Sequence, residues 1–267
     1  MLKNVFVKSL RDQRRSLLFW GIGLLALALL MTLYYPSIAQ MKSINQYIEG
    51  ASKQLIEAFT GGGMIDLASP TGYFNTELFS LMVPLLFIVF GVGIAANAVA
   101  GEEEKRTLEF MLALPISRRR FLFQKLVLIV VAMFILALVF WAGIAIGIAA
   151  LHIDISLFKV TQAVIAAVLL TLVFVSLTLA VGCWRGSKSL AVGVGGGVAA
   201  VMYFLSVLGS LVEGLKPLRI ISPFYHYTAA NTLAKGFDAV HIPVLLALAV
   251  VFFVLSFPLF ERRDIGV

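Results

Sequence analysis

Six long apolar stretches alternate with short polar segments along the chain. A helix rises 1.5 Å per residue and must cross about 30 Å of hydrocarbon, so a span needs roughly 20 apolar residues. The stretches closest to this length are 17–33, 78–100, 126–151, 163–181, 190–212 and 244–260, and none of them contains Asp, Glu, Lys, Arg or His. The pattern predicts an all-α integral membrane protein with six transmembrane helices, whose even number places both termini on one side.

The composition agrees with this fold class. Hydrophobic residues make up 61% of the 267 residues and charged residues 13%, whereas an ordinary soluble domain carries about 25% charged residues. No segment between the apolar stretches is large enough to close a core of its own. We therefore expect one transmembrane domain that covers residues 1–267.

The distribution of basic residues predicts the orientation. Fifteen of the 21 Lys and Arg residues lie in the N-terminal segment, the 101–125 and 182–189 loops and the C-terminal tail. Loops rich in Lys and Arg stay in the cytoplasm, so both termini and the 101–125 loop are expected there. The net charge of +7 is then a topology signal. Nucleic-acid binding is not favoured, because no basic face carries interleaved aromatic residues.

Three segments beside the predicted spans carry helical patterns of their own. Residues 1–15 place apolar and basic side chains on different faces, which indicates either an interfacial helix on the inner leaflet or a frayed basic tail. Residues 36–75 indicate an amphipathic outer helix followed by a glycine turn. The 213–241 stretch, interrupted by Pro217 and Pro223, is expected to form outer helices that lie on the surface or re-enter the membrane before the last span.

Several kinds of chemistry are missing from the sequence. No ionisable residue lies within the spans, which disfavours an ion-coupled carrier. The chain has no P-loop and none of the common intramembrane hydrolase motifs, so we expect no enzyme activity and no nucleotide site of its own. A single cysteine, Cys183, and three scattered histidines, His152, His226 and His241, show no metal-ligand spacing.

Residues 101–120 hold the most informative polar pattern. The segment starts with three glutamates, Leu108, Met111 and Leu112 share one helical face, and Pro115 ends the pattern. Carboxylates suit the positive end of the dipole of a short helix. Such a helix between two spans is either a lever that a partner protein pushes or a solvated loop whose charges fix the topology.

The same segment resembles a known family signature. The run Glu102-x-Glu104-x-x-Thr107-Leu108-Glu109, continued through Leu112, Pro115-Ile116-Ser117-Arg118 and Lys125, is similar to the pattern of ABC-2 type transporter permeases, the membrane subunits of ATP-binding-cassette exporters. Arg106 departs from it, because the family usually carries Gly there. The Ser222-Pro223-Phe224-Tyr225-His226-Tyr227 run and the ending Phe260-Glu261-Arg262-Arg263-Asp264-Ile265 resemble two further family runs.

The resemblance implies partners and a mechanism. Residues 101–115 would form a coupling helix seated in a groove of an ABC ATP-binding subunit, present in two copies that bind ATP and Mg; this chain itself would hold no cofactor. Two permeases, with a homodimer as the expected arrangement, would form the substrate path in the cell membrane. The residues expected to contact the ATPase are Glu102, Glu104, Thr107, Leu108, Glu109, Met111, Leu112, Pro115 and Arg118.

Small and polar residues within the spans suggest packing sites. Gly143-x-x-x-Gly147 and Gly193-x-x-x-Gly197 each allow close helix approach, more often inside one subunit, although Gly193 and Gly197 are also candidates for a dimer interface. The polar residues Asn97, Thr171, Ser176 and Thr178 are expected to bond between helices. The candidates for the substrate path are Met82, Phe87, Asn97 and Tyr203, for which plain packing is the alternative.

The sequence therefore predicts a permease that works with a separate ATPase and exports a hydrophobic or amphipathic substrate, such as a drug, lipid or peptide, because the spans offer no charged binding group. The alternatives are a membrane scaffold or assembly factor that uses ATPase motion for other work, and an ion-coupled carrier.

Overall fold

A computed structural model describes residues 5–39, 69–108 and 116–263. Six stretches in it are helical, long and apolar enough to cross a membrane, which confirms the predicted all-α fold with six transmembrane helices. Five of them are single helices: α1 (Val5–Ala39), α8 (Arg118–Leu151), α9 (Leu157–Arg185), α10 (Lys188–Leu211) and α13 (His241–Glu261). The remaining stretch joins α4 (Pro70–Phe74), the π-helix η1 (Asn75–Phe79) and α5 (Met82–Ala98).

Helices α8, α9 and α10 extend past their apolar stretches to residues that cap their ends. Ser117 caps α8 by accepting a hydrogen bond from the Arg120 N–H, and Ser187 caps α10 in the same way through the Leu190 N–H. Gly186, with φ of 65°, ends α9 in the left-handed conformation that glycine adopts at little cost. The turn between α9 and α10 is therefore built from one C-cap and one N-cap.

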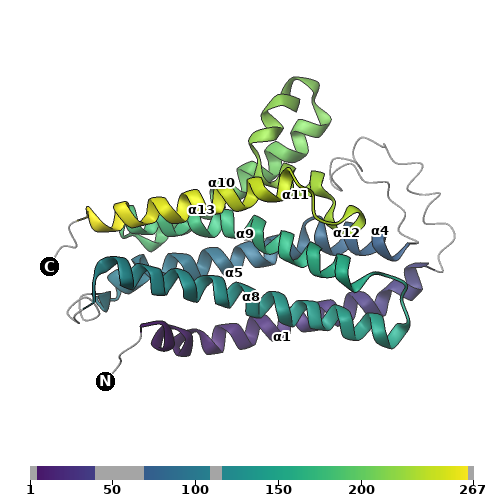
Figure 1. Ribbon diagram of the computed structural model, residues 1–267, viewed down its shortest axis with the longest axis horizontal. Coiled ribbons are helices and arrows are strands. Elements are labelled where there is room, and N and C mark those ends of the chain that lie inside the picture. The colour runs from purple at the N-terminus through teal and green to yellow at the C-terminus, as the bar shows by residue number, and fades with distance from the viewer. Residues whose placement is uncertain (1–4, 40–68, 109–115, 264–267) are drawn as a thin grey trace.

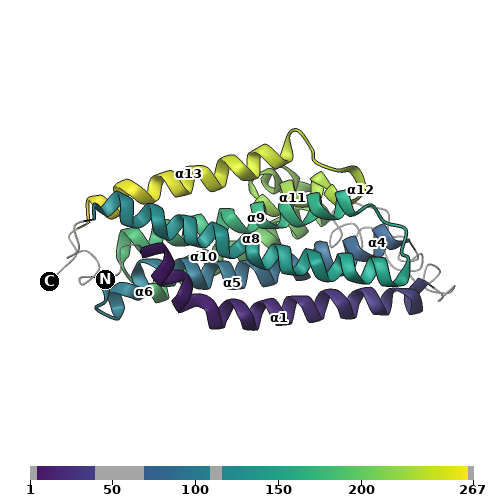
Figure 2. The same ribbon diagram turned by 60° about the horizontal axis from the view of Figure 1, so that its bottom comes forward.

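The long helices form a bundle in which α9 is central. Figures 1 and 2 show the helices running roughly side by side, with the start of α1, the end of α13 and the short helix α6 (Ala100–Glu104) at one end. We refer to this as the α6 end, and to the opposite one, which holds α4 and the short helix α11 (Pro223–Ala230), as the α11 end. Helix α9 packs against α5, α8, α10 and α13.

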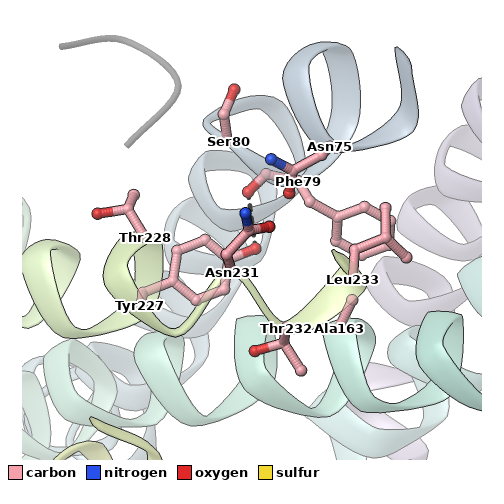
Figure 3. Close-up of a pocket in the computed structure, with 9 residues that line it drawn as sticks. All are labelled: Asn75, Phe79, Ser80, Ala163, Tyr227, Thr228, Asn231, Thr232 and Leu233. Carbon is pink, nitrogen blue, oxygen red and sulfur yellow. Dashed lines mark hydrogen bonds between the residues drawn. The ribbon is translucent and has the colours of Figure 1, made fainter. Parts of the chain in front are cut away.

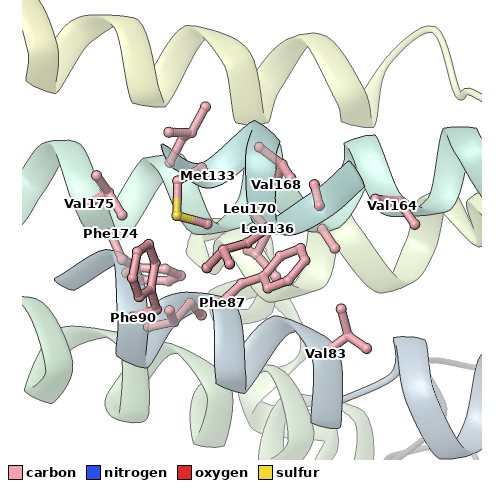
Figure 4. Close-up of a cluster of buried hydrophobic side chains, with 14 of the residues drawn as sticks. Val83, Phe87, Phe90, Met133, Leu136, Val164, Val168, Leu170, Phe174 and Val175 are labelled. Carbon is pink, nitrogen blue, oxygen red and sulfur yellow. The ribbon is translucent and has the colours of Figure 1, made fainter. Parts of the chain in front are cut away.

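Aromatic and branched side chains fill the centre of the bundle. Phe87 of α5 is fully buried and meets the ring of Phe140 on α8 edge to face, with 6.2 Å between the ring centroids. Figure 4 shows Phe87 beside Met133 and Leu136 of α8 and close to Leu170 of α9. Phe87, which the sequence offered as a substrate-path candidate, is thus a core residue.

Helices α1 and α8 form a tight seam along one edge of the bundle. A Cβ atom on Gly143 would lie 2.7 Å from the Cβ of Ala28, and one on Gly147 would lie 2.6 Å from the Cβ of Thr32. Both distances are too short for real side chains, so only glycine lets the two backbones approach this closely. The first of the two glycine motifs therefore packs inside the subunit.

The segments beside the spans differ in part from their sequence-based predictions. Residues 5–15 are helical but continuous with the first span, and Figure 2 shows the first turns of α1 bending away from the rest of the helix. Helix α1 also continues through Pro36 to Ala39, whereas the pattern of 36–75 predicts a separate outer helix. Residues 40–68, where most of that helix would lie, are outside the described residues.

The 213–241 stretch is largely helical, as expected for the outer helices. It holds the 3-10 helix η2 (Glu213–Ile221), α11 and α12 (Thr232–Lys235). The end of α10 and η2 form a hairpin that projects from the side of the bundle in Figure 1. Ser222 begins α11: its hydroxyl accepts from the Phe224 N–H and donates to the Met202 carbonyl of α10 at 2.7 Å.

The four polar residues expected to bond between helices bond within their own helices, so that prediction is wrong. Asn97 donates to the Gly93 carbonyl, Thr171 to Ala167, Ser176 to Val173 and Thr178 to Phe174, each three or four residues back along its own helix. A hydroxyl or amide in apolar surroundings needs a partner, and the nearest carbonyl of its own helix supplies one without help from a neighbour.

Candidate functional site

Three consecutive glutamates at the start of the 101–115 segment each bind a different part of the bundle. The first, Glu102, accepts a hydrogen bond from the Lys125 ammonium of α8 at 2.8 Å. Lys125 is only 2% exposed and also donates to the Ser9 hydroxyl of α1 at 2.9 Å. Thr107 donates to the other Glu102 carboxylate oxygen at 2.5 Å. Glu102 thus ties α6 to the seam between α1 and α8.

The electrostatic balance at Glu102 favours its charged form. Burial alone would raise the pKa of the carboxyl, but the Lys125 charge and the hydrogen bonds from Lys125 and Thr107 outweigh burial. The pKa of Glu102 therefore lies below its ordinary value. The Glu102 carboxylate is charged at neutral pH, and its part in the ion pair is lost as the pH falls through this lowered pKa.

Glu103 connects α6 to the end of the chain. Its carboxylate forms an ion pair with Arg263, whose guanidinium also donates to the carbonyls of Gly182 and Cys183 at 3.2 and 3.1 Å. These carbonyls belong to the last turns of α9, where a cation is favoured by the helix dipole. Gly186 lies against this pair, and a side chain there would collide with both Glu103 and Arg263.

Glu104 connects α6 to α10. Its carboxylate accepts from the backbone N–H of Lys188, the first residue of α10, at 2.9 Å. A carboxylate at this position satisfies a free N–H and suits the positive end of the helix dipole.

Arg118, at the start of α8, binds the C-terminal end of a helix. Its guanidinium donates to the carbonyls of Glu261 and Arg263 at 3.2 and 2.8 Å, where α13 ends.

The turn after α6 contains Arg106 with φ of 56°. This left-handed conformation favours glycine, and the related family usually carries glycine at this position. The departure noted in the sequence is therefore an arginine held in a glycine-type turn. The Arg106 N–H donates to the Glu103 carbonyl at 2.8 Å, and the Thr107 N–H donates to the Glu102 carbonyl at 2.9 Å, which close the turn.

Only part of the predicted ATPase contact set can be placed. Leu108 is 1% exposed and packs in the core of this chain, while Glu102, Thr107 and Arg118 are bonded within the chain. Their side chains therefore position the segment, and are poorly placed to touch a partner directly. Of the predicted contacts that the structure describes, Glu104 is exposed, together with its neighbours Lys105 and Arg106. Glu109, Met111, Leu112 and Pro115 lie outside the described residues.

Sequence reasoning missed the roles of Glu103 and Ser9. Glu103 was one acidic residue in a row of three, and Ser9 was one polar residue in a basic segment. Their partners lie 160 and 116 positions away along the chain. The Arg263 of the family-like C-terminal run was the available signal for the Glu103 partner.

A groove runs between α5 and α10. It has a volume of about 430 Å³, and its lining is almost entirely apolar. Tyr203 and Phe224 line it towards the α11 end, and their rings meet edge to face with 5.4 Å between centroids. Of the four path candidates, Tyr203 alone is among its lining residues; Met82 packs beside the core and Asn97 bonds to its own helix.

A second hollow at the α11 end is polar and much smaller. Figure 3 shows it between η1, α9, α11 and α12, with Asn75, Tyr227 and Asn231 among its lining residues. Its volume of about 20 Å³ has room for about one water molecule. A substrate larger than a water molecule could therefore fit in the groove between α5 and α10, but not in this hollow.

Gly193 and Gly197 lie on an open face of α10. A Cβ atom on either residue would meet no atom within 4 Å in the part of the chain that the structure describes, and both residues are exposed. Packing inside the subunit, the more common use of such a motif, is thus contradicted for this pair. The glycine face lies beside the groove, whose α10 wall includes Val192 and Gly196.

Comparison with protein families agrees with the site. A family model described as "ABC-2 family transporter protein" matches residues 3–265. The chain therefore belongs to the ABC-2 transporter family, and membership implies a multi-pass membrane permease that works with an ABC ATPase. A search of curated proteins finds no match.

Proposed function

We propose that this chain is the permease subunit of an ATP-driven exporter in the cell membrane. Two copies of the chain, with two ATP-binding subunits that carry ATP and Mg, form the complete transporter. The α6 end faces the cytoplasm, in agreement with the basic residues that gather in its loops and tail. The 101–115 segment is where the ATPase docks.

The observation that carries this proposal is the set of contacts made by α6. Three adjacent carboxylates bind the α1–α8 seam, the end of α9 together with Arg263, and the start of α10. A displacement of α6 by a docked partner would therefore pull on almost every span at once. A loop whose charges only set the topology would need none of these contacts.

The groove supports a hydrophobic or amphipathic substrate. Its apolar lining offers burial but no charged group to neutralise an ionic substrate. The open glycine face next to it would let a helix of a second copy approach closely. Two grooves that face each other across such an interface would form the substrate path.

The test is transport by the reconstituted pair. The chain is purified together with the ATPase that accompanies it, and efflux of lipophilic probes from proteoliposomes is measured with and without ATP. We expect ATP-dependent efflux in the wild type and weaker ATPase binding and efflux in Glu104→Lys, which reverses an exposed charge on α6. The control is Glu213→Lys, the same reversal on exposed η2 at the α11 end, which should behave as wild type.

The possible outcomes separate the proposal from its alternatives. ATPase binding without any ATP-dependent efflux would indicate a scaffold that uses ATPase motion for other work. Efflux that responds to an ion gradient and not to ATP would indicate a carrier. Unchanged ATPase binding in Glu104→Lys would count against docking at the exposed surface of α6.

A further inference from the structure

Two histidines that the sequence keeps apart meet at the α11 end. His226 of α11 and His241, the first residue of α13, point their Nδ1 atoms at each other across 3.0 Å. The other ring nitrogen of His226, Nε2, lies 2.9 Å from the Ile220 carbonyl of η2. His226 is thus held between two elements, and the pair joins α11 to a membrane span.

The protons of this pair can be placed from its partners. The Ile220 carbonyl only accepts, so the Nε2 of His226 carries a proton. In the neutral ring the Nδ1 of His226 is then an acceptor, and the Nδ1 of His241 donates to it. One proton therefore lies between the two Nδ1 atoms. If each Nδ1 carried a proton, neither ring could accept, and the hydrogen bond between the two rings would be lost.

A first added proton leaves the contact intact. It can bind the free Nε2 of His241, which keeps Nδ1 as a donor to His226. Asp238, which precedes α13, is charged near the pair: its carboxylate accepts from the backbone N–H groups of Val240 and His241 at 2.8 Å, and these bonds keep the pKa of Asp238 low. The contact breaks only when His226 also becomes charged.

Among the other charged groups on the elements around α11, Arg219 of η2 lies beside the pair: it stacks over the Tyr225 ring at 5.0 Å, and that ring contacts both histidines. The remaining groups have partners elsewhere or lie away from the pair: Lys216 pairs with Glu213, and the Lys159 ammonium of α9 donates to the Ala234 carbonyl. Lys235 of α12 is exposed, and the charged residues of α10 and α13, Lys188 and Glu261, lie at their opposite ends.

The pair is better suited to bind a proton than a metal ion. Among the residues that the structure describes, no third His, Cys, Asp or Glu joins these two in a group that could hold a metal. A proton needs no third ligand. The burial of His226 and its histidine neighbour also hold the pKa of His226 below the ordinary value of 6.5.

Helix α11 closes the end of the groove, so its attachment matters. Phe224 of α11 lines the groove, Ser222 is bonded to α10, and the Tyr227 hydroxyl donates to the Phe79 carbonyl at 2.6 Å. These anchors do not titrate in the physiological pH range. The bond to α13 through His226 and His241 is the anchor that a change of pH can release.

We propose that His226 and His241 form a pH-dependent latch that holds α11, and with it the outer end of the groove, against α13. The latch is closed when at most one of the two rings is charged and opens when both are. Its regulatory meaning rests on the proposed function, because the outer end of the groove would be the exit of the substrate path.

The direction of the pH dependence follows from the proton count. In the closed latch His226 resists protonation, whereas in an open latch it has an ordinary pKa of about 6.5. The closed state is therefore fully favoured above this value and loses its advantage as the pH falls below it. Acidification of the outer side is expected to loosen α11 and leave the α6 end unchanged.

The test is amide hydrogen exchange of the chain in nanodiscs without its ATPase, between pH 7.5 and pH 5, corrected for the intrinsic pH dependence of exchange. We expect the η2 and α11 amides to exchange about twofold to tenfold faster at the acidic end, the factor for loss of one hydrogen bond. In His226→Asn and in His241→Asn this step should vanish, because an amide keeps a neutral hydrogen bond at every pH.

His152→Asn is the matched control. His152 is exposed and caps α8 with φ of 50°, a conformation that asparagine also tolerates, so this variant should keep the step. Protected α9 amides report that each variant is folded. A flat wild-type profile, or a step that survives in either latch variant, would overturn the proposal. Since no ATPase is present, a failure of ATP-driven transport would not affect this result.

Discussion

The seam between α1 and α8 and the face beside the α5–α10 groove carry the same glycine motif but use it in opposite ways. At Gly143 and Gly147 the motif is closed, because Ala28 and Thr32 of α1 fill the space that side chains would need. At Gly193 and Gly197 no atom of the described residues would lie within 4 Å of an added Cβ. The motif thus predicts that a helix face can be approached closely, but not by which partner.

Helix α6 stands between these two regions and is bound to both. Glu102 joins it to the seam through buried Lys125, and Glu104 joins it to α10 through an exposed backbone N–H. The seam would act as the fixed side of the subunit and α10 as the side that can move. Four substitutions, ordered by their expected effect on the free energy of unfolding of one subunit, test this contrast.

The largest effect is expected for Lys125→Met. Removing one partner of a buried ion pair leaves a carboxylate without compensation, and we expect the free energy of unfolding to fall by about 3 kcal/mol. The double variant Lys125→Met with Glu102→Leu should recover much of this loss, since both charges are then gone. Reversible unfolding in mixed micelles measures both. A loss below about 0.5 kcal/mol would mean that this end of the seam is solvated.

A smaller loss is expected for Gly147→Leu. The new side chain would collide with Thr32, so α1 and α8 must separate, at a cost of about 2 kcal/mol. The loss is expected in the same unfolding measurement, with no change in ATPase binding. A stability equal to that of wild type would show that the seam can open without cost, which contradicts its role as the fixed side.

A modest gain is expected for Arg106→Gly. Arg106 has φ of 56°, which costs a residue with a side chain roughly 1 kcal/mol relative to glycine. Part of this gain is offset because glycine makes the unfolded chain more flexible. Lys105→Gly is the control: Lys105 has φ of −82°, so glycine should destabilise the protein there. Equal effects of the two variants would indicate that the turn is not strained.

The smallest effect on the folded subunit is expected for Gly197→Leu. The residue is exposed with open space around it, so the free energy of unfolding should change by no more than about 0.5 kcal/mol. Self-association, measured by energy transfer between labelled subunits in nanodiscs, should nevertheless fall strongly. Association that equals that of wild type would place the interface between copies elsewhere.

The sequence was informative wherever a property depends on neighbouring residues. Apolar stretches indicated the number of spans, because every backbone group in a membrane must be bonded within a helix. The starts of α8 at Ser117 and of α11 at Ser222 were not predicted, although a serine N-cap, followed by Pro223 in α11, is a local signal. The prediction of interhelical hydrogen bonds failed because a nearby partner was available: Thr171 and Thr178 each donate to the carbonyl four residues back in their own helix.

Contacts between distant segments could not be read from the sequence. Lipid tails and protein interiors are equally apolar, so hydropathy does not tell which helix faces which. The positions of α1 and α8 decided that Gly143 and Gly147 are closed, and the fold of the 213–241 stretch brought His226 to His241. The sequence alone determined the six spans, because local hydrophobicity suffices for these. The helix predicted over 101–115 is interrupted: α6 ends at Glu104 and a turn follows at Arg106, while 109–115 lie outside the described residues. Only the tertiary structure decided the partner of each glutamate, glycine and histidine, because such pairing depends on how helices distant in sequence pack.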